Sequence, residues 1–170
     1  ERFPMGKKRN ICIENCQNDI IVQMDDDDYY PPESLLARVT NLIKHPEINC
    51  VGCNQIGCYD LIQRKSYLSS DGLNYFSEAS MAFRKKFWEK RKFLDDDIRG
   101  EGKYFLEYRQ SELLNIPFQF VIIALNHTNN LTSFRSLKNE NQSINDSNSL
   151  FDLIENETQI FLGKLIQTLQ

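Results

Sequence analysis

The sequence predicts an α/β fold, because short apolar runs of strand length alternate with longer segments of helical periodicity. Three observations support this prediction: the apolar run at 19–24, the helical pattern at 32–44 and the apolar run at 118–125. The chain has 170 residues, of which 41% are hydrophobic. This composition suits one domain with a real core.

The first elements follow from local pattern. We expect a helix over residues 7–16 and then a mostly buried strand over 19–24. Pro32 is typical of the first turn of a helix, and that helix should end near Pro46. Its apolar residues recur at helical spacing and predict an apolar face made by Leu35, Leu36, Val39, Leu42 and Ile43.

The later elements are shorter, and turn residues separate them. We expect, in chain order, a strand at 49–59, a turn at 60–62, a strand at 63–68, a loop over a site at 69–78, a short strand at 79–83, a helix at 84–90, a helix at 103–114 and a buried strand at 118–125.

Composition changes abruptly toward the C-terminus. The segment 136–149 contains the run KNENQSINDSNS, which is too polar to bury a core and is predicted to be a linker. Residues 150–170 then show apolar positions at helical spacing, which predicts an amphipathic helix. We therefore divide the chain into a main domain over 1–135, a linker over 136–149 and a C-terminal helix over 150–170.

Charge and hydropathy exclude several classes of protein. The formal net charge is −4, so no basic field attracts nucleic acid, and no nucleic-acid partner is expected. The sequence has no apolar run near the roughly 18–20 residues that span a bilayer, so no transmembrane segment is expected. Nor does an apolar segment typical of a secretory signal follow residues 1–10.

Five cysteines are present, which is an odd number, and their spacing does not match a zinc site with two close ligand pairs. We interpret them as buried thiols in a reducing compartment, and expect a cytoplasmic protein. A metal or redox role for the CxxC at Cys50 and Cys53 is the alternative.

Four consecutive aspartates, Asp25–Asp28, follow the first predicted strand. Adjacent carboxylates repel one another unless cations or water compensate, and hard divalent cations are their natural partners. Ligands of open α/β sheets gather beyond the carboxyl ends of the strands, where this run lies. The run therefore indicates a cation site, with a solvated acidic loop that caps the next helix as the alternative.

The stretch KKRNICIENCQNDIIVQMDDDDYYPPESLLARV resembles the centre of a family 2 glycosyltransferase with the GT-A fold. Downstream, SMAFRKKFW is similar to the segment that lines the acceptor side, and GEGKYFLEYR to the acidic motif that opens a helix. The resemblance covers residues 6–132. It implies a Rossmann-like sandwich with a mixed central sheet and, in this chain, an additional C-terminal helix.

The resemblance also implies a donor and metal site. Asp25 and Asp27 occupy the two acidic positions of an Asp-x-Asp motif, which binds Mn²⁺ or Mg²⁺ and the diphosphate of a nucleotide sugar. Asp25 and Asp26 would contact the donor. Lys8 and Arg9 match a basic element that contacts the nucleotide, although a solvated helix face is an alternative. The register within Asp25–Asp28 could be shifted by one residue.

Two further site residues are implied. Glu101 matches the general base that takes the proton of the acceptor hydroxyl, with a structural helix cap as the alternative. Gly102 stands where the family often has a second acid, and the acidic run 95–97 could substitute. His127 matches a late histidine that serves as a further metal ligand, although a structural histidine is equally compatible.

The resemblance predicts a metal-dependent, inverting glycosyltransferase that moves a sugar from a nucleotide-diphosphate donor to an unknown acceptor. The family begins with a strand–helix–strand unit that this sequence does not contain, so we expect an incomplete nucleotide pocket. The alternatives are a non-catalytic remnant that serves as a binding or structural module, and a metal-dependent phosphohydrolase.

Overall fold

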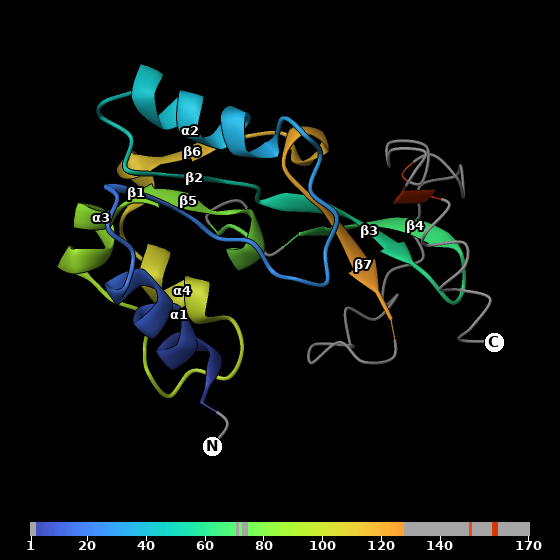
Figure 1. Cartoon of the computed structure of the whole chain (residues 1–170), viewed down its shortest axis with the longest axis horizontal. Coiled ribbons are helices and arrows are strands. Elements are labelled where there is room, and N and C mark those ends of the chain that lie inside the picture. The colour runs from blue at the N-terminus through green and yellow to red at the C-terminus, as the bar shows by residue number, and fades with distance from the viewer. Residues whose placement is uncertain (1–2, 71, 73–74, 128–149, 151–157, 160–170) are drawn as a thin grey trace.

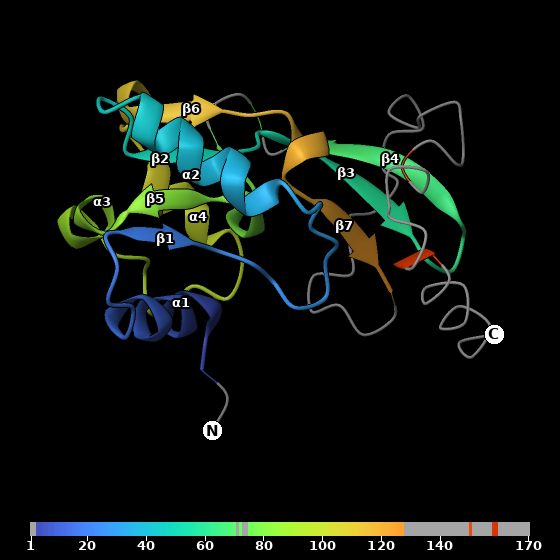
Figure 2. The ribbon, with the colours of Figure 1, turned by 45° about the horizontal axis from the view of Figure 1, so that its top comes forward.

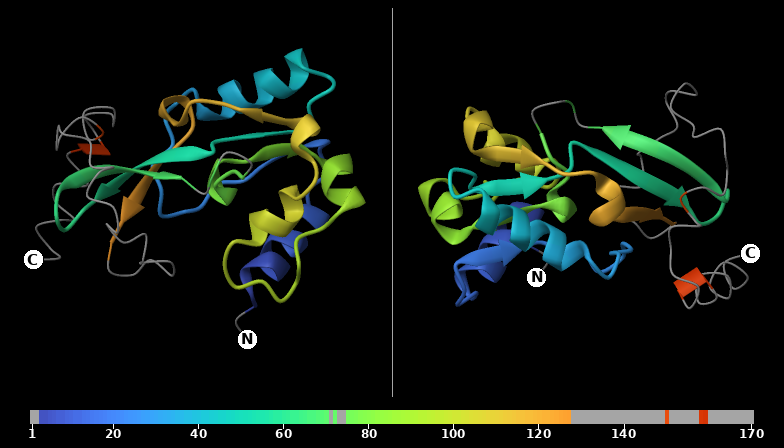
Figure 3. Two further views of the ribbon diagram at one scale, coloured as in Figure 1. Left: turned by 180° about the vertical axis from the view of Figure 1, so that it is seen from behind. Right: turned by 90° about the horizontal axis from the view of Figure 1, so that it is seen from above.

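The computed structural model describes residues 3–70, 72, 75–127, 150 and 158–159. Two sheets are joined end to end, and helices cover both faces of the larger sheet (Figure 1). Helix α2 lies on one face, and helices α1 and α4 lie on the opposite face, as the views from behind and above also show (Figure 3). The bounds of the α-helices are Met5–Glu14 for α1, Ser34–Lys44 for α2, Lys85–Lys90 for α3 and Glu101–Leu106 for α4. The predicted α/β class is confirmed.

The larger sheet is mixed and has the strand order β1-β5-β2-β6 (Figure 2). Strand β5 runs antiparallel to β1 and to β2, whereas β6 runs parallel to β2. Strands β1, β2 and β6 therefore point the same way, and the aspartate run lies beyond the carboxyl end of β1. The four strands are Ile20–Val22 (β1), Ala82–Arg84 (β5), Cys50–Gly52 (β2) and Leu113–Asn115 (β6).

The smaller sheet has the order β4-β3-β7, with β4 antiparallel and β7 parallel to β3. Its strands are Gln55–Asp60 (β3), Lys65–Ser70 (β4) and Ile123–Asn126 (β7). Strand β7 returns to the loop that follows β1, because Tyr29 and Ile123 pair through their backbones. This pairing brings the end of β7 beside the aspartate run.

Side chains that alternate along the strands fill two cores, one on each face of the larger sheet. Ala82 and Val51 pack in the core on the side of Leu42 of α2. Phe83 and Cys50, their neighbours in sequence, pack in the core beside α1, α3 and α4. The second core is rich in aromatic rings, and the ring of Phe105 contacts those of Phe83, Phe87 and Phe93.

Of the apolar face predicted for α2, only Leu42 is fully buried. Leu35, Leu36 and Ile43 are 55%, 69% and 65% exposed, and the helix turns Ser34, Arg38 and Leu42 toward the sheet instead. Burial of Arg38 is possible because its guanidinium donates hydrogen bonds to the carbonyl oxygen of Gln23 and to Ser34. The hydrogen bonds of Arg38, rather than the polarity of its side chain, thus allow this face of α2 to be buried.

Three later predictions also need correction. The helix predicted at 103–114 ends at Leu106, because Tyr108 has a positive φ of 58° and residues 113–115 pair with β2 as β6. The strand predicted at 118–125 starts only at Ile123, after a 3₁₀ turn that follows Pro117. The strand predicted at 49–59 is divided between the two sheets.

Up to residue 127, the other strands and helices that the sequence predicts are present, with small shifts of their ends. The shortest is the strand predicted at 79–83, which forms as β5 after a 3₁₀ turn, η1, over Glu78–Ser80. The predicted linker and C-terminal helix lie almost entirely outside the described residues. Of the helices that the structure describes, none combines the length and apolar character needed to cross a membrane.

Candidate active site

The aspartate run is held in place by residues that lie behind it. The hydroxyl of Tyr30 accepts a hydrogen bond of 2.7 Å from the backbone N–H of Asp25 and donates one to the carbonyl oxygen of Ala79. Burial, with the nearby Asp28 carboxylate, raises the pKa of the Tyr30 phenol, so it stays protonated. The carboxylate of Asp28 accepts a hydrogen bond from the N–H of Leu125 in β7. Both ends of the run are therefore anchored.

This anchoring gives a first testable prediction, for Tyr30→Phe. Loss of the hydroxyl leaves the half-buried N–H of Asp25 without this acceptor, and such a loss typically decreases the free energy of unfolding by about 1–2 kcal/mol. Urea denaturation measures the change. Tyr108→Phe is the matched control, because Tyr108 is 84% exposed, and we expect it to match the parent. Equal stability of Tyr30→Phe and the parent would contradict this role of the hydroxyl.

Arg9 lies at the centre of the site, between two acidic groups that are far apart in sequence. Its Nε donates a hydrogen bond of 2.6 Å to Oε1 of Glu101, and its Nη1 lies 3.4 Å from Oδ1 of Asp25. Burial lowers the pKa of Arg9, but Asp25 and Glu101 together outweigh burial, and the pKa is raised overall. The guanidinium is thus held ionised, and it connects α1, the aspartate run and α4.

Helix α1 is positioned for this role by Asn10, which is buried. The Asn10 amide donates hydrogen bonds to the carbonyl oxygen of Phe93 and to Asp95, and its oxygen accepts one from the indole N–H of Trp88. Trp88 is itself buried. Asn10 therefore fixes the helix that presents Lys8 and Arg9.

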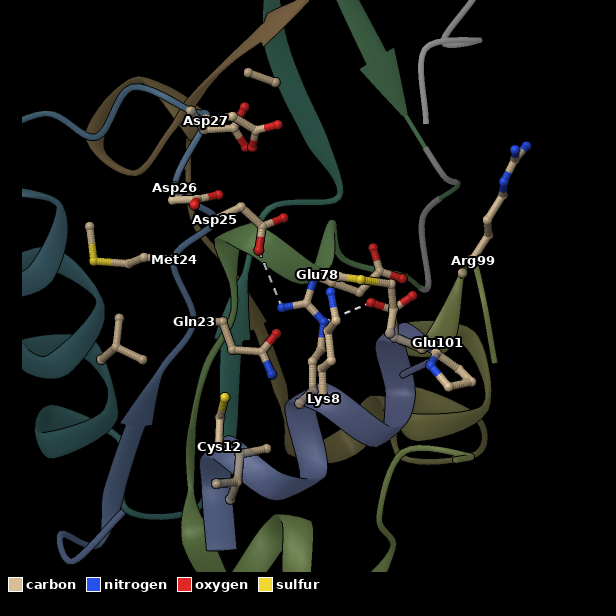
Figure 4. Close-up of a pocket in the computed structure, with 18 of the residues that line it drawn as sticks. Lys8, Cys12, Gln23, Met24, Asp25, Asp26, Asp27, Glu78, Arg99 and Glu101 are labelled. Atoms are coloured by element: carbon tan, nitrogen blue, oxygen red, sulfur yellow. Dashed lines mark hydrogen bonds and ion pairs between the residues drawn. The ribbon is translucent and has the colours of Figure 1, made fainter. Parts of the chain in front are cut away.

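These groups line one cleft of about 1090 Å³, which is large enough for a ligand of the size of a nucleotide sugar. Its wall includes Lys8, Arg9, the whole aspartate run, Glu78 and Glu101. In Figure 4, Asp25, Asp26 and Asp27 lie at one end, and Glu78 and Glu101 lie beside each other at the other end. Such a cleft has carboxylates that can bind a metal cation and basic side chains that can bind phosphate. It also has carboxylates that can accept a proton.

The residues predicted to bind a metal fit a hard divalent cation by chemistry, since they supply carboxylate oxygens and an imidazole nitrogen. His127 follows β7, and its Nε2 lies 3.7 Å from Oδ2 of Asp27. Asp25 instead faces Arg9. Across the described part of the chain, no three His, Cys, Asp or Glu side chains gather closely enough to form a metal cluster.

The structure brings together most of the residues predicted for the site. Lys8, Arg9, Asp25–Asp28 and Glu101 all line the cleft, and His127 lies beside Asp27. Of the alternative acids, Asp95 is engaged by Asn10, and the run 95–97 does not belong to the cleft lining.

Sequence reasoning missed four residues of the site and its support, namely Asn10, Tyr30, Arg38 and Glu78. Only Asn10 had a local signal, because it directly follows the basic pair in KKRN. Glu78 and Arg38 reach their places through packing between distant elements, and local pattern does not reveal such packing.

The fold and cleft define an α/β protein with an acidic site beyond the carboxyl end of a strand, which is where such folds bind ligands. The family model described as "Glycosyl transferase family 2" matches residues 1–125. The chain therefore belongs to glycosyl transferase family 2 and is a glycosyltransferase by family. A search of curated proteins finds no match for the chain.

Proposed function

We propose that this chain transfers a sugar from a nucleotide-diphosphate donor to an acceptor hydroxyl, with inversion and with the help of a divalent cation. The observation that supports this proposal best is the shared cleft, which joins the aspartate run, Arg9 and Glu101. Asp25, Asp27 and His127 would hold Mn²⁺ or Mg²⁺, and when bound this cation would neutralise the charge of the diphosphate leaving group.

The protein side chains have separate tasks in this proposal. Lys8 and Arg9 lie on the same helix and offer positive charge to the phosphates, while Asp25 and Asp26 contact the remainder of the donor. The acceptor hydroxyl must lose its proton as it attacks the sugar, and a carboxylate within hydrogen-bond reach of that hydroxyl would accept this proton. Glu101 is the candidate for this base that the sequence provides.

A panel of UDP-, GDP- and dTDP-linked sugars tests the proposed function. Each donor is incubated with the protein and Mn²⁺, with and without EDTA, and release of the nucleoside diphosphate is measured by chromatography. We expect release from at least one donor, lost with EDTA. Nucleoside monophosphate or inorganic phosphate as the product would instead indicate a phosphohydrolase. No turnover of any donor would indicate a non-catalytic binding module.

A further inference from the structure

Glu78 is an acidic residue of the cleft to which the sequence assigns no role. It opens the 3₁₀ turn η1 before β5, and its side chain is partly buried in the cleft wall. Its Oε1 accepts a hydrogen bond of 2.9 Å from the backbone N–H of Gly102, in the first turn of α4. The Glu78 carboxylate is therefore held against α4, beside Glu101.

The absence of a side chain at Gly102 makes this contact possible. A Cβ atom placed on Gly102 would lie 2.9 Å from Oε1 of Glu78 and 3.0 and 3.1 Å from its Cγ and Cδ. The carboxyl group of Glu78 thus occupies the space that a side chain at position 102 would fill. Position 102 is where the resemblance to the family suggests a second acid, and here a different element supplies that acid.

The two neighbouring carboxylates differ in their surroundings. Glu101 is engaged by the guanidinium of Arg9 at 2.6 Å, and only 5% of its side chain is exposed, so its negative charge is directly neutralised. Burial, and then repulsion from Glu101, raises the pKa of Glu78, while Gly102 and Arg9 lower it by less. The Glu78 carboxylate, held at the cleft wall by Gly102 and not itself paired with a guanidinium at hydrogen-bond distance in the way that Glu101 is, therefore accepts a proton more readily than an ordinary glutamate.

We propose that Glu78 is the general base of the transfer, in the space left by Gly102, and that Glu101 is a positioning residue that fixes Arg9. In this step the acceptor O–H gives its proton to the Glu78 carboxylate. The acceptor oxygen forms a bond to the anomeric carbon of the sugar. The bond from that carbon to the diphosphate oxygen breaks, and its electron pair leaves with the nucleoside diphosphate. The inference rests on the proposed function.

The main test compares the pH dependence of transfer in the parent and in Glu78→Gln, with the donor that the panel identifies and Mn²⁺ present. Glutamine keeps the shape and the acceptor for Gly102 but cannot take a proton. We expect a decrease in rate of about 100-fold or more, and the fall of the rate toward acid pH should disappear. Glu47→Gln is the matched control, because Glu47 is exposed and outside the cleft lining.

A relocation experiment tests the position directly. Glu78→Ala should lose transfer. The double variant Glu78→Ala with Gly102→Asp should transfer at least about 10-fold faster than Glu78→Ala alone, because the new side chain enters the space that Glu78 has vacated. Gly102→Asp alone should give no gain, since Glu78 still fills that space. Failure of the double variant to recover, in a protein with the parent's melting temperature, would overturn the assignment.

Stability provides a readout that is independent of turnover. The pKa of Glu78 in the folded protein lies above its ordinary value of 4.5. Its contribution to stability is therefore full below about pH 4.5 and is lost as the pH rises through the raised pKa. Glu78→Gln should consequently raise the melting temperature at pH 8 more than at pH 4.5. A lower melting temperature at pH 8, with activity that follows the folded fraction, would make Glu78 a structural anchor of α4.

These outcomes separate the two proposals. If the parent turns over no nucleotide sugar, the proposed function fails before Glu78 is tested. If the parent is active and Glu78→Gln matches its rate and pH profile, only the assignment of Glu78 fails.

Discussion

Replacement of Asp25 and Asp27 together by asparagine is expected to abolish the Mn²⁺-dependent rise in melting temperature and to lower transfer by about 1000-fold. A cation that binds only the folded state raises the melting temperature, so loss of its ligands removes that rise. A metal held by Asp25 and Asp27 would stabilise the leaving diphosphate by several kcal/mol in the transition state, and each 1.4 kcal/mol corresponds to a factor of ten in rate. Differential scanning fluorimetry with a Mn²⁺ titration and the nucleotide-sugar assay measure the two effects.

The control for the Asp25 and Asp27 variant must also remove two negative charges, but outside the cleft. Asp19→Asn with Glu47→Gln removes two carboxylates that are exposed and outside the cleft lining, one of them just before the start of β1. This double variant should keep the full Mn²⁺ response. An undiminished response in the Asp25 and Asp27 variant, by contrast, would remove the Asp-x-Asp assignment. His127→Ala, tested alone, then shows whether the imidazole adds to the Mn²⁺ response, as expected of a ligand beside Asp27.

Much of this site could be predicted because its signal is contiguous. A buried strand, an acidic run and a proline-initiated helix follow one another within 19–44, and local periodicity is sufficient to place them. The partnership of Arg9 with Glu101 is different, because it joins residues 92 positions apart. The family resemblance brought both residues to the site, but only the packing of α1 against α4 shows that they are paired.

The features that the sequence did not predict, the burial of Arg38 and the position of Glu78, have a common physical cause. The leucines of α2 suggested an inward apolar face, yet Arg38 is fully buried because backbone carbonyl oxygens and Ser34 satisfy its guanidinium. Similarly, Glu78 lies in a segment predicted to be a loop over a site, and its role depends on the missing side chain at Gly102. Neither feature is encoded in neighbouring residues, since each needs a complementary group from another element.

Glu101→Gln is expected to lower transfer by about 100-fold, even though Glu101 is not the proton acceptor in our proposal. Glutamine can still accept a hydrogen bond from Arg9, but the ion pair is lost, and hydrogen bonds to charged groups contribute about 1.5–3 kcal/mol. Arg9 would then turn further toward Asp25, the carboxylate 3.4 Å from its Nη1. We therefore also expect a weaker Mn²⁺ response in the melting experiment. Glu89→Gln, an exposed change on α3, is the control.

The pH profile of Glu101→Gln then decides between the two carboxylates. A positioning residue changes the rate at every pH, so the fall of the rate toward acid pH should persist in this variant and disappear only in Glu78→Gln. If the acid limb instead disappears in Glu101→Gln, Glu101 is the base that the sequence predicted and Glu78 only supports it. If transfer continues at the parent rate, Glu101 is a structural residue of the first turn of α4. In that case the ion pair with Arg9 stabilises the fold without contributing to the reaction.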